Sequence, residues 1–185
     1  MSIHAEFEQE LGSKYFLNQR VVGGFDTSAL TLAPLRSVVI AKVHLSREAA
    51  FQLMLTGIHE WFPGVEEFVW TKTDNGRIVA GSVRTGNYKG STMVEPILYI
   101  EDGYFYVYQI DLDATTKFIP IQNHLGIFTV EALSDETSLV VWRQYFDNTI
   151  PLTGKLIAWV MEDRTAEPAF DSLVQRFGGE RIEYW

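Results

Sequence analysis

The sequence contains no cysteine, which excludes disulfide bonds, thiol catalysis and thiolate metal ligands. Basic residues are few: 15 lysines and arginines oppose 24 aspartates and glutamates, so the net charge is −9. Such a chain is poorly suited to nucleic acid or to an anionic membrane. It also lacks a signal-peptide core and any apolar run of about 20 residues that could span a bilayer. We therefore expect a cytoplasmic protein without a nucleic-acid partner or membrane insertion.

Catalytic and metal-binding motifs are also missing. The segment HEWFP (59–63) has Pro63 where an HExxH zinc motif requires its second histidine. The sequence has no GxSxG elbow, P-loop or EF-hand loop. The nearby carboxylates Glu60, Glu66 and Glu67 are more typical of a solvated rim than of a metal site. We expect no cofactor and no metal.

Aromatic residues, in contrast, are abundant. They make up 14% of the 185 residues, and hydrophobic residues make up 46%. A chain of this length forms one domain with a sizeable core. The aromatic surplus indicates either a thick core or an aromatic-lined cavity.

The order of predicted elements defines the domain. We interpret residues 1–34 as an N-terminal extension that packs on a domain at 35–185. A strand at 37–45 is followed by a helix that Ser46 caps, over 47–57, and by a short helix at 58–62 that Pro63 ends. Turn-forming segments then separate six further predicted strands: 66–73, 76–86, 91–101, 104–112, 122–133 and 137–147.

The last segment changes to a helical period. A long amphipathic helix is predicted between Pro151 and Gly178-Gly179, with a kink at Pro168. Its apolar face comprises Leu152, Leu156, Trp159, Val160, Phe170, Leu173, Val174 and Phe177. The pattern predicts an α+β fold: a curved seven-stranded antiparallel sheet wraps around a long C-terminal helix, with two short helices after the first strand. One helix does not fill so large a sheet, so a cavity is expected between them.

Several segments carry a family resemblance. They are SREAAFQLMLTGIHEWFPGVEEF (46–68), RIVAGSVRTG (77–86), MVEPILYIED (93–102) and the terminal helix. In this order they resemble the START-like/SRPBCC superfamily, which has the helix-grip fold, and most closely its polyketide cyclase/dehydrase and lipid-transport family. The resemblance spans about 37–178. It implies a ligand between the sheet and the C-terminal helix.

Strand alternation indicates which side chains face that cavity. It places His124 and Phe128 on the concave side, with Thr129, Glu131 and Arg143 pointing to solvent. The residues predicted to contact a ligand are Trp61, Phe62, Tyr104, Tyr106, Tyr108, Phe128, Trp142, Phe146 and Trp159.

Three ionisable residues are candidates for chemistry. Arg84 and Glu95 flank the hairpin NYKG (87–90), so they lie close together on neighbouring strands. They form either a structural ion pair or a polar anchor and acid–base pair. His124 is the best candidate for a general acid or base, although a single cavity histidine is more often a hydrogen-bonded filler.

The sequence favours a module that binds a small apolar or aromatic molecule, lipid-like or polyketide-like. The alternative implied by the resemblance is a cyclase/dehydrase that uses His124, Arg84 and Glu95 with tyrosine hydroxyls. A third hypothesis is a protein partner docked by residues 1–34. Whether a reaction is catalysed, and whether the chain forms a homodimer, is left open by the sequence.

Overall fold

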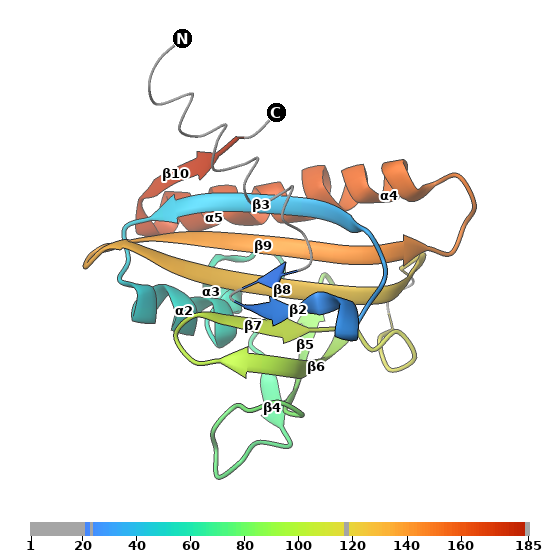
Figure 1. Cartoon of the computed structure of the whole chain (residues 1–185), viewed down its shortest axis with the longest axis horizontal. Helices are drawn as coiled ribbons and strands as arrows, with labels where there is room; N and C mark the ends of the chain where they lie inside the picture. The colour runs from blue at the N-terminus through green and yellow to red at the C-terminus, as the bar shows by residue number, and fades with distance from the viewer. Residues whose placement is uncertain (1–20, 23, 117–118, 184–185) are drawn as a thin grey trace.

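A computed structural model describes residues 21–22, 24–116 and 119–183 of the chain (Figure 1). Its main feature is an antiparallel sheet of eight strands in the order β10-β3-β9-β8-β7-β6-β5-β4. The described elements are, in chain order, β1 (Val21–Val22), β2 (Phe25–Asp26), the 3₁₀ turn η1 (Thr27–Ala29), β3 (Leu35–Val43), α2 (Arg47–Leu55), α3 (Ile58–Trp61), β4 (Val69–Thr71), β5 (Val83–Tyr88), β6 (Ser91–Glu101), β7 (Phe105–Tyr108), β8 (Ile121–Ser134), β9 (Thr137–Asn148), α4 (Gly154–Met161), the π-helical η2 (Glu162–Ala166), α5 (Glu167–Phe177) and β10 (Gly179–Ile182).

The two short helices after β3 are confirmed. Ser46 caps α2 as predicted, because its hydroxyl accepts a hydrogen bond from the backbone N–H of Ala49. α3 ends at Trp61, two residues before Pro63. Both helices bury apolar side chains against the concave side of the sheet, where they pack with α5.

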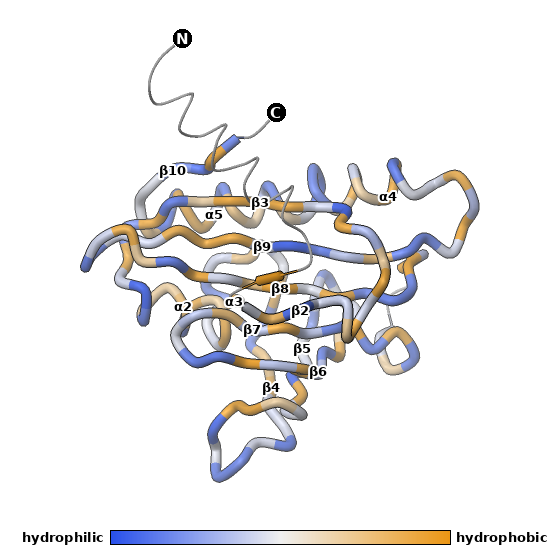
Figure 2. Tube along the Cα trace, in the orientation of Figure 1, coloured by the Kyte–Doolittle hydropathy of each residue, from blue (hydrophilic) through white to orange (hydrophobic). Residues whose placement is uncertain are grey.

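The first two strands after α3 are shorter than predicted. β4 covers only Val69–Thr71, and β5 begins at Val83, although strands are predicted over 66–73 and 76–86. The connection between them contains left-handed backbone at Lys72 and Asn75, with φ of 54° and 50°. This conformation is incompatible with a pleated strand, so a loop with a hydrophilic tip replaces the ends of the two predicted strands, while β4 and β5 remain paired (Figure 2).

The eighth strand, β10, corrects the prediction of seven. The double glycine was expected only to end the C-terminal helix. In the structure Gly178 and Gly179 have φ of 75° and 119°, and they turn the chain back so that β10 pairs with β3. A side chain at Gly179 would collide with the backbone of Lys42, so glycine is required for this pairing.

The C-terminal helix lies along one face of the sheet, as predicted, and its regular geometry is interrupted in the turn before Pro168. α4 passes into the π-helical η2 before α5 begins (Figure 1). In a regular α-helix the Pro168 ring would collide with the carbonyl of Arg164, which lies within η2. The change of helical geometry therefore precedes the proline.

The outer face of the sheet is covered by residues from the N-terminal segment. Val22 and Ala33 are buried against a second apolar cluster, and Phe25 lies 4.5 Å from Tyr99 between ring centroids. Figure 1 shows β2 in front of β7 and β8. Residues 1–20 lie outside the described part of the chain.

This cover corrects the expected exposure of two outward-pointing residues. Thr129 and Arg143 are only 7% and 4% exposed, and Nη1 of Arg143 donates to the Thr129 hydroxyl over 3.0 Å. The pattern of strand alternation predicts the face on which a residue lies, but it does not report what covers that face.

Candidate ligand cavity

A cavity of about 480 Å³ lies between the sheet and α4. Its size falls within the range of about 300–1,000 Å³ that is usual for small-molecule sites. The residues that line it are Ile58, Phe62, Val65, Phe68, Arg84, Tyr88, Met93, Glu95, Tyr108, Ile110, Ile119, Pro120, Phe128, Trp142, Gln144, Ile150, Thr153, Leu156, Ile157, Val160, Met161 and Thr165. Most of them are apolar, so an apolar ligand body is favoured.

Three stacked rings form part of the cavity wall on the sheet. Phe128 and Trp142 are paired residues on β8 and β9, and their rings lie 5.0 Å apart at an interplanar angle of 13°. Tyr108 on β7 continues the row, 6.3 Å from Phe128 at 19°. Residues on one face of neighbouring strands bring these rings together. The stacked rings give this part of the wall an aromatic character, which suits contact with an aromatic ligand.

Two glycines make room for rings that line the cavity. A side chain at Gly126 would occupy the space of the Tyr108 ring, which lies over the backbone of β8. Likewise, a side chain at Gly86 on β5 would collide with Phe68. Glycine within a strand thus permits the close approach of another group, here an aromatic ring.

Arg84 and Glu95 form the polar part of the wall. They are directly paired across β5 and β6, and Nε of Arg84 donates to Oε2 of Glu95 over 2.6 Å. Nη1 of Arg84 donates to the Tyr106 hydroxyl over 3.2 Å, and that hydroxyl donates to the Met54 carbonyl over 2.6 Å. The guanidinium carbon also lies 4.7 Å from the ring centroid of Tyr108.

Burial and charge act together on these groups. Burial favours the neutral form of Arg84, but the Glu95 carboxylate acts together with Tyr106 and Tyr108 to outweigh it, so the pKa of Arg84 is above its ordinary value. Burial raises the pKa of Tyr106 to about 12, although Arg84 opposes this shift. Burial likewise raises the pKa of Tyr108, whose oxygen accepts the indole N–H of Trp142 over 3.0 Å. At neutral pH both phenols are therefore protonated.

His124 is not among the residues that line the cavity, although its ring lies 5.7 Å from that of Tyr108, which does line it. Its Nδ1 accepts the backbone N–H of Ile110 over 3.1 Å, so the neutral ring carries its proton on Nε2. Nε2 has no hydrogen-bond partner within the described residues. Burial lowers the pKa of His124 to about 4, with Gln144 acting in the opposite direction. The ring is therefore neutral at pH 7.

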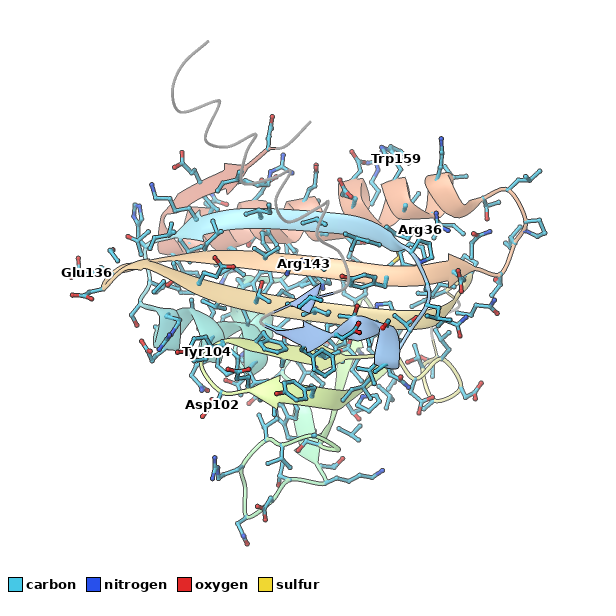
Figure 3. All side chains as sticks on the ribbon, in the orientation of Figure 1. Arg36, Asp102, Tyr104, Glu136, Arg143 and Trp159 are labelled. Carbon is cyan, nitrogen blue, oxygen red and sulfur yellow. The ribbon has the colours of Figure 1, made fainter. Side chains whose placement is uncertain are left out.

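The structure places the predicted residues in three groups. Arg84 and Glu95 line the cavity together with four predicted ligand contacts: Phe62, Tyr108, Phe128 and Trp142. Three other predicted contacts are buried but do not line it: Trp61, Tyr106 and Phe146. The remaining two, Tyr104 and Trp159, are about half exposed and point away from it (Figure 3).

Tyr104 and Trp159 lie away from the cavity for local reasons. Tyr104 precedes β7, which begins at Phe105, so strand alternation does not apply to it. Trp159 lies on the outer side of α4, where Figure 3 shows it projecting from the molecule. Asn123 has a φ of 53°, and the pairing register of β8 with β9 shifts between Gln122 and Leu125. His124 nevertheless lies on the predicted concave side, because its ring centroid is 5.7 Å from that of Tyr108, which lines the cavity.

Tyr88 and Met93 also line the cavity, although they are not among the residues predicted from the sequence. Their spacing from Arg84 and Glu95 could have identified them from the sequence. Tyr88 follows Arg84 by four residues on β5, and Met93 precedes Glu95 by two on β6, so each shares a strand face with a residue that was chosen.

Other kinds of site find no support in residues 21–22, 24–116 and 119–183. No group of three or more histidines, aspartates or glutamates there is arranged to hold a metal ion. In the same residues, no helix has both the length and the apolar character required to cross a bilayer.

A curved antiparallel sheet that grips a C-terminal helix beside an apolar cavity defines the helix-grip, START-like fold. The model of the family described as polyketide cyclase / dehydrase and lipid transport matches residues 41–178. The chain belongs to this family. No curated protein matches it in sequence.

Solved structures agree with this fold. The protein XoxI from Bacillus cereus has 23% identity and a TM-score of 0.61, with 76% of this chain and 94% of that chain covered. A START superfamily protein from Mycobacterium smegmatis has 11% identity and a TM-score of 0.58, with 76% and 95% covered. The Zhui aromatase/cyclase from Streptomyces sp. R1128 has 10% identity and a TM-score of 0.55, with 76% and 91% covered.

Proposed function

We propose that this protein binds a small apolar or aromatic molecule in the cavity between its sheet and α4. The observation that carries this proposal is the row of stacked rings from Tyr108 to Trp142 in a largely apolar wall. Contact with such a wall removes apolar surface of the ligand from water, which is the main source of its affinity.

The access to the cavity supports the same proposal. Leu156 and Val160 of α4 line the cavity and are nevertheless 59% and 42% exposed. Ile150, in the loop before α4, has the same two properties. A ligand would therefore enter past apolar side chains. Phe62 packs against Trp142 with ring centroids 5.8 Å apart, lines the cavity and is partly exposed, so it is a candidate lid.

Native mass spectrometry of the purified protein tests the proposal, because a bound molecule adds its mass to that of the chain. We expect the cavity-filling substitution Ile157→Trp to abolish that adduct. Val69→Trp, at an exposed position on β4, is the matched control and should retain it. An adduct that persists in folded Ile157→Trp protein would place the ligand elsewhere.

A cyclase/dehydrase activity is the second candidate function. It is favoured by one observation, the placement of both Arg84 and Glu95 on the cavity wall beside the Tyr108 ring. In a dehydration, the Glu95 carboxylate would remove the proton next to a carbonyl and then pass it to the β-hydroxyl, which would leave as water. His124 would have no direct part, since it does not line the cavity.

Formation of a conjugated enone from a β-hydroxyketone, followed by ultraviolet absorbance, tests this activity. We expect Glu95→Gln to abolish turnover and His124→Asn to retain it. No enone with folded wild-type protein, over a panel of aryl β-hydroxyketones, would leave binding as the function.

A further inference from the structure

The contact between Arg84 and Glu95 occupies only part of their hydrogen-bonding capacity. Their contact joins Nε to Oε2, and Nη1 of Arg84 is taken by Tyr106. Within the described residues, Nη2 of Arg84 and Oε1 of Glu95 take part in no hydrogen bond, although both residues line the cavity. The cavity thus presents an unused N–H donor and an unused carboxylate acceptor side by side.

The same two residues also fix the charge of the cavity. They are the only charged residues among those that line it in the described part of the chain, and their charges cancel. Tyr108 and Gln144 add polar groups without adding charge. An anionic ligand would therefore bring an uncompensated charge into a largely apolar site, beside the Glu95 carboxylate.

We propose that the cavity selects an uncharged ligand with a planar apolar body and a polar end that carries both a hydrogen-bond acceptor and a donor. A carboxamide or a hydroxyketone has this character. The ligand oxygen accepts from Nη2 of Arg84, and the ligand N–H or O–H donates to Oε1 of Glu95. The carboxylate of the same shape is rejected, because Glu95 repels it and already neutralises Arg84. This inference rests on the proposed binding function.

Three naphthalene probes of nearly equal shape test the selectivity in the wild-type protein. They are 2-naphthamide, which has acceptor and donor; 2-acetylnaphthalene, which has the acceptor alone; and 2-naphthoate, which is an anion at pH 7.5. Isothermal titration calorimetry should give affinities in that order, with the amide at least about tenfold tighter than the carboxylate.

The variant Glu95→Gln changes the charge of the site with little change in shape. Because it leaves Arg84 without its counter-ion, 2-naphthoate should gain at least about tenfold in affinity relative to the amide. Glu180→Gln is the matched control. It removes the same charge from a partly exposed pair with Lys42 on β10 and β3, and it should leave the probe ranking unchanged.

Each outcome has a separate meaning. If wild-type protein binds 2-naphthoate as tightly as 2-naphthamide, the selectivity is wrong while the binding function stands. If no probe binds the folded protein and no adduct is carried from expression, the binding function itself fails. Should Glu95→Gln not fold, as judged by circular dichroism, the wild-type ranking still decides the proposal.

Discussion

Nε of Arg84 lies 2.6 Å from Oε2 of Glu95, at directly paired positions of β5 and β6. Both side chains are buried, with 2% and 10% of their surfaces exposed. Two charges removed from water in this way are tolerated only together, because each supplies the interactions that water would otherwise provide. The pair is therefore a structural requirement of the sheet as well as the polar end of the cavity.

Removal of one partner should be more harmful than removal of both. We expect Arg84→Met or Glu95→Leu to lower the free energy of unfolding by about 3–5 kcal/mol, since each leaves one buried charge unpaired. The double variant should be closer to wild type than either single variant. Urea unfolding followed by circular dichroism measures all three.

The ion pair of Lys42 with Glu180 serves as the exposed control. Both side chains are more than a third exposed, so the corresponding alanine substitutions should each cost no more than about 1 kcal/mol. Equal losses from the two pairs would contradict the structural role assigned to Arg84 and Glu95.

His124 should make stability depend on pH. Its folded-state pKa of about 4 lies below the ordinary value of 6.5, because burial disfavours the charged ring. Between these values the unfolded chain binds more protons, so stability falls as pH decreases from about 6.5 to 4 and then levels off. The contribution is about 3 kcal/mol. Nuclear magnetic resonance titration of the imidazole measures the pKa directly.

Two substitutions separate the charge of His124 from its hydrogen bond. Both His124→Asn and His124→Leu should remove this part of the pH dependence. Asparagine can still accept the Ile110 N–H with its side-chain oxygen, whereas leucine leaves that donor unpaired and should cost about 1–3 kcal/mol more at pH 7. An unchanged slope in His124→Asn would show that another group titrates.

Trp61 and Phe62 are neighbours with different expected roles. Phe62 lines the cavity, so Phe62→Ala should weaken 2-naphthamide binding by about tenfold or more at a modest loss of stability. Trp61 is 1% exposed and does not line the cavity, so Trp61→Ala should mainly lower stability, by about 3–5 kcal/mol. Calorimetry and urea unfolding measure the two effects, with exposed His59→Ala as the control. A larger loss of affinity in folded Trp61→Ala protein would reverse these roles.

We expect Gly126 to be required for stability only because the Tyr108 ring packs against it. We expect Gly126→Ala to cost about 1–3 kcal/mol in the wild-type background, since its methyl group collides with Tyr108. In a Tyr108→Leu background, the same change should cost much less. Thermal unfolding of the four proteins measures the coupling. An equal cost in both backgrounds would assign the requirement to the backbone of β8 instead.

Several features were predictable from the sequence because they depend on residues a few positions apart. Ser46 caps α2 through the next turn of the chain, and Pro63 follows the end of α3. The NYKG hairpin fixes the register that sets Arg84 opposite Glu95. Local signals of this kind also predicted the order of strands and helices, and with it the fold and the family.

The sequence by itself determined a single apolar-rich acidic chain with a START-like order of elements and one buried charge pair. Strand alternation already placed Phe128 on the cavity side, but only the tertiary structure decided that Trp61 and Trp159 do not line the cavity. Trp61 is buried against Phe128 and Phe170, and Trp159 lies on the exposed side of α4. Both outcomes depend on how the helices pack on the sheet, which neighbouring residues in the sequence do not fix. β10 arose in the same way, because two glycines allowed the chain to return to the free edge of β3.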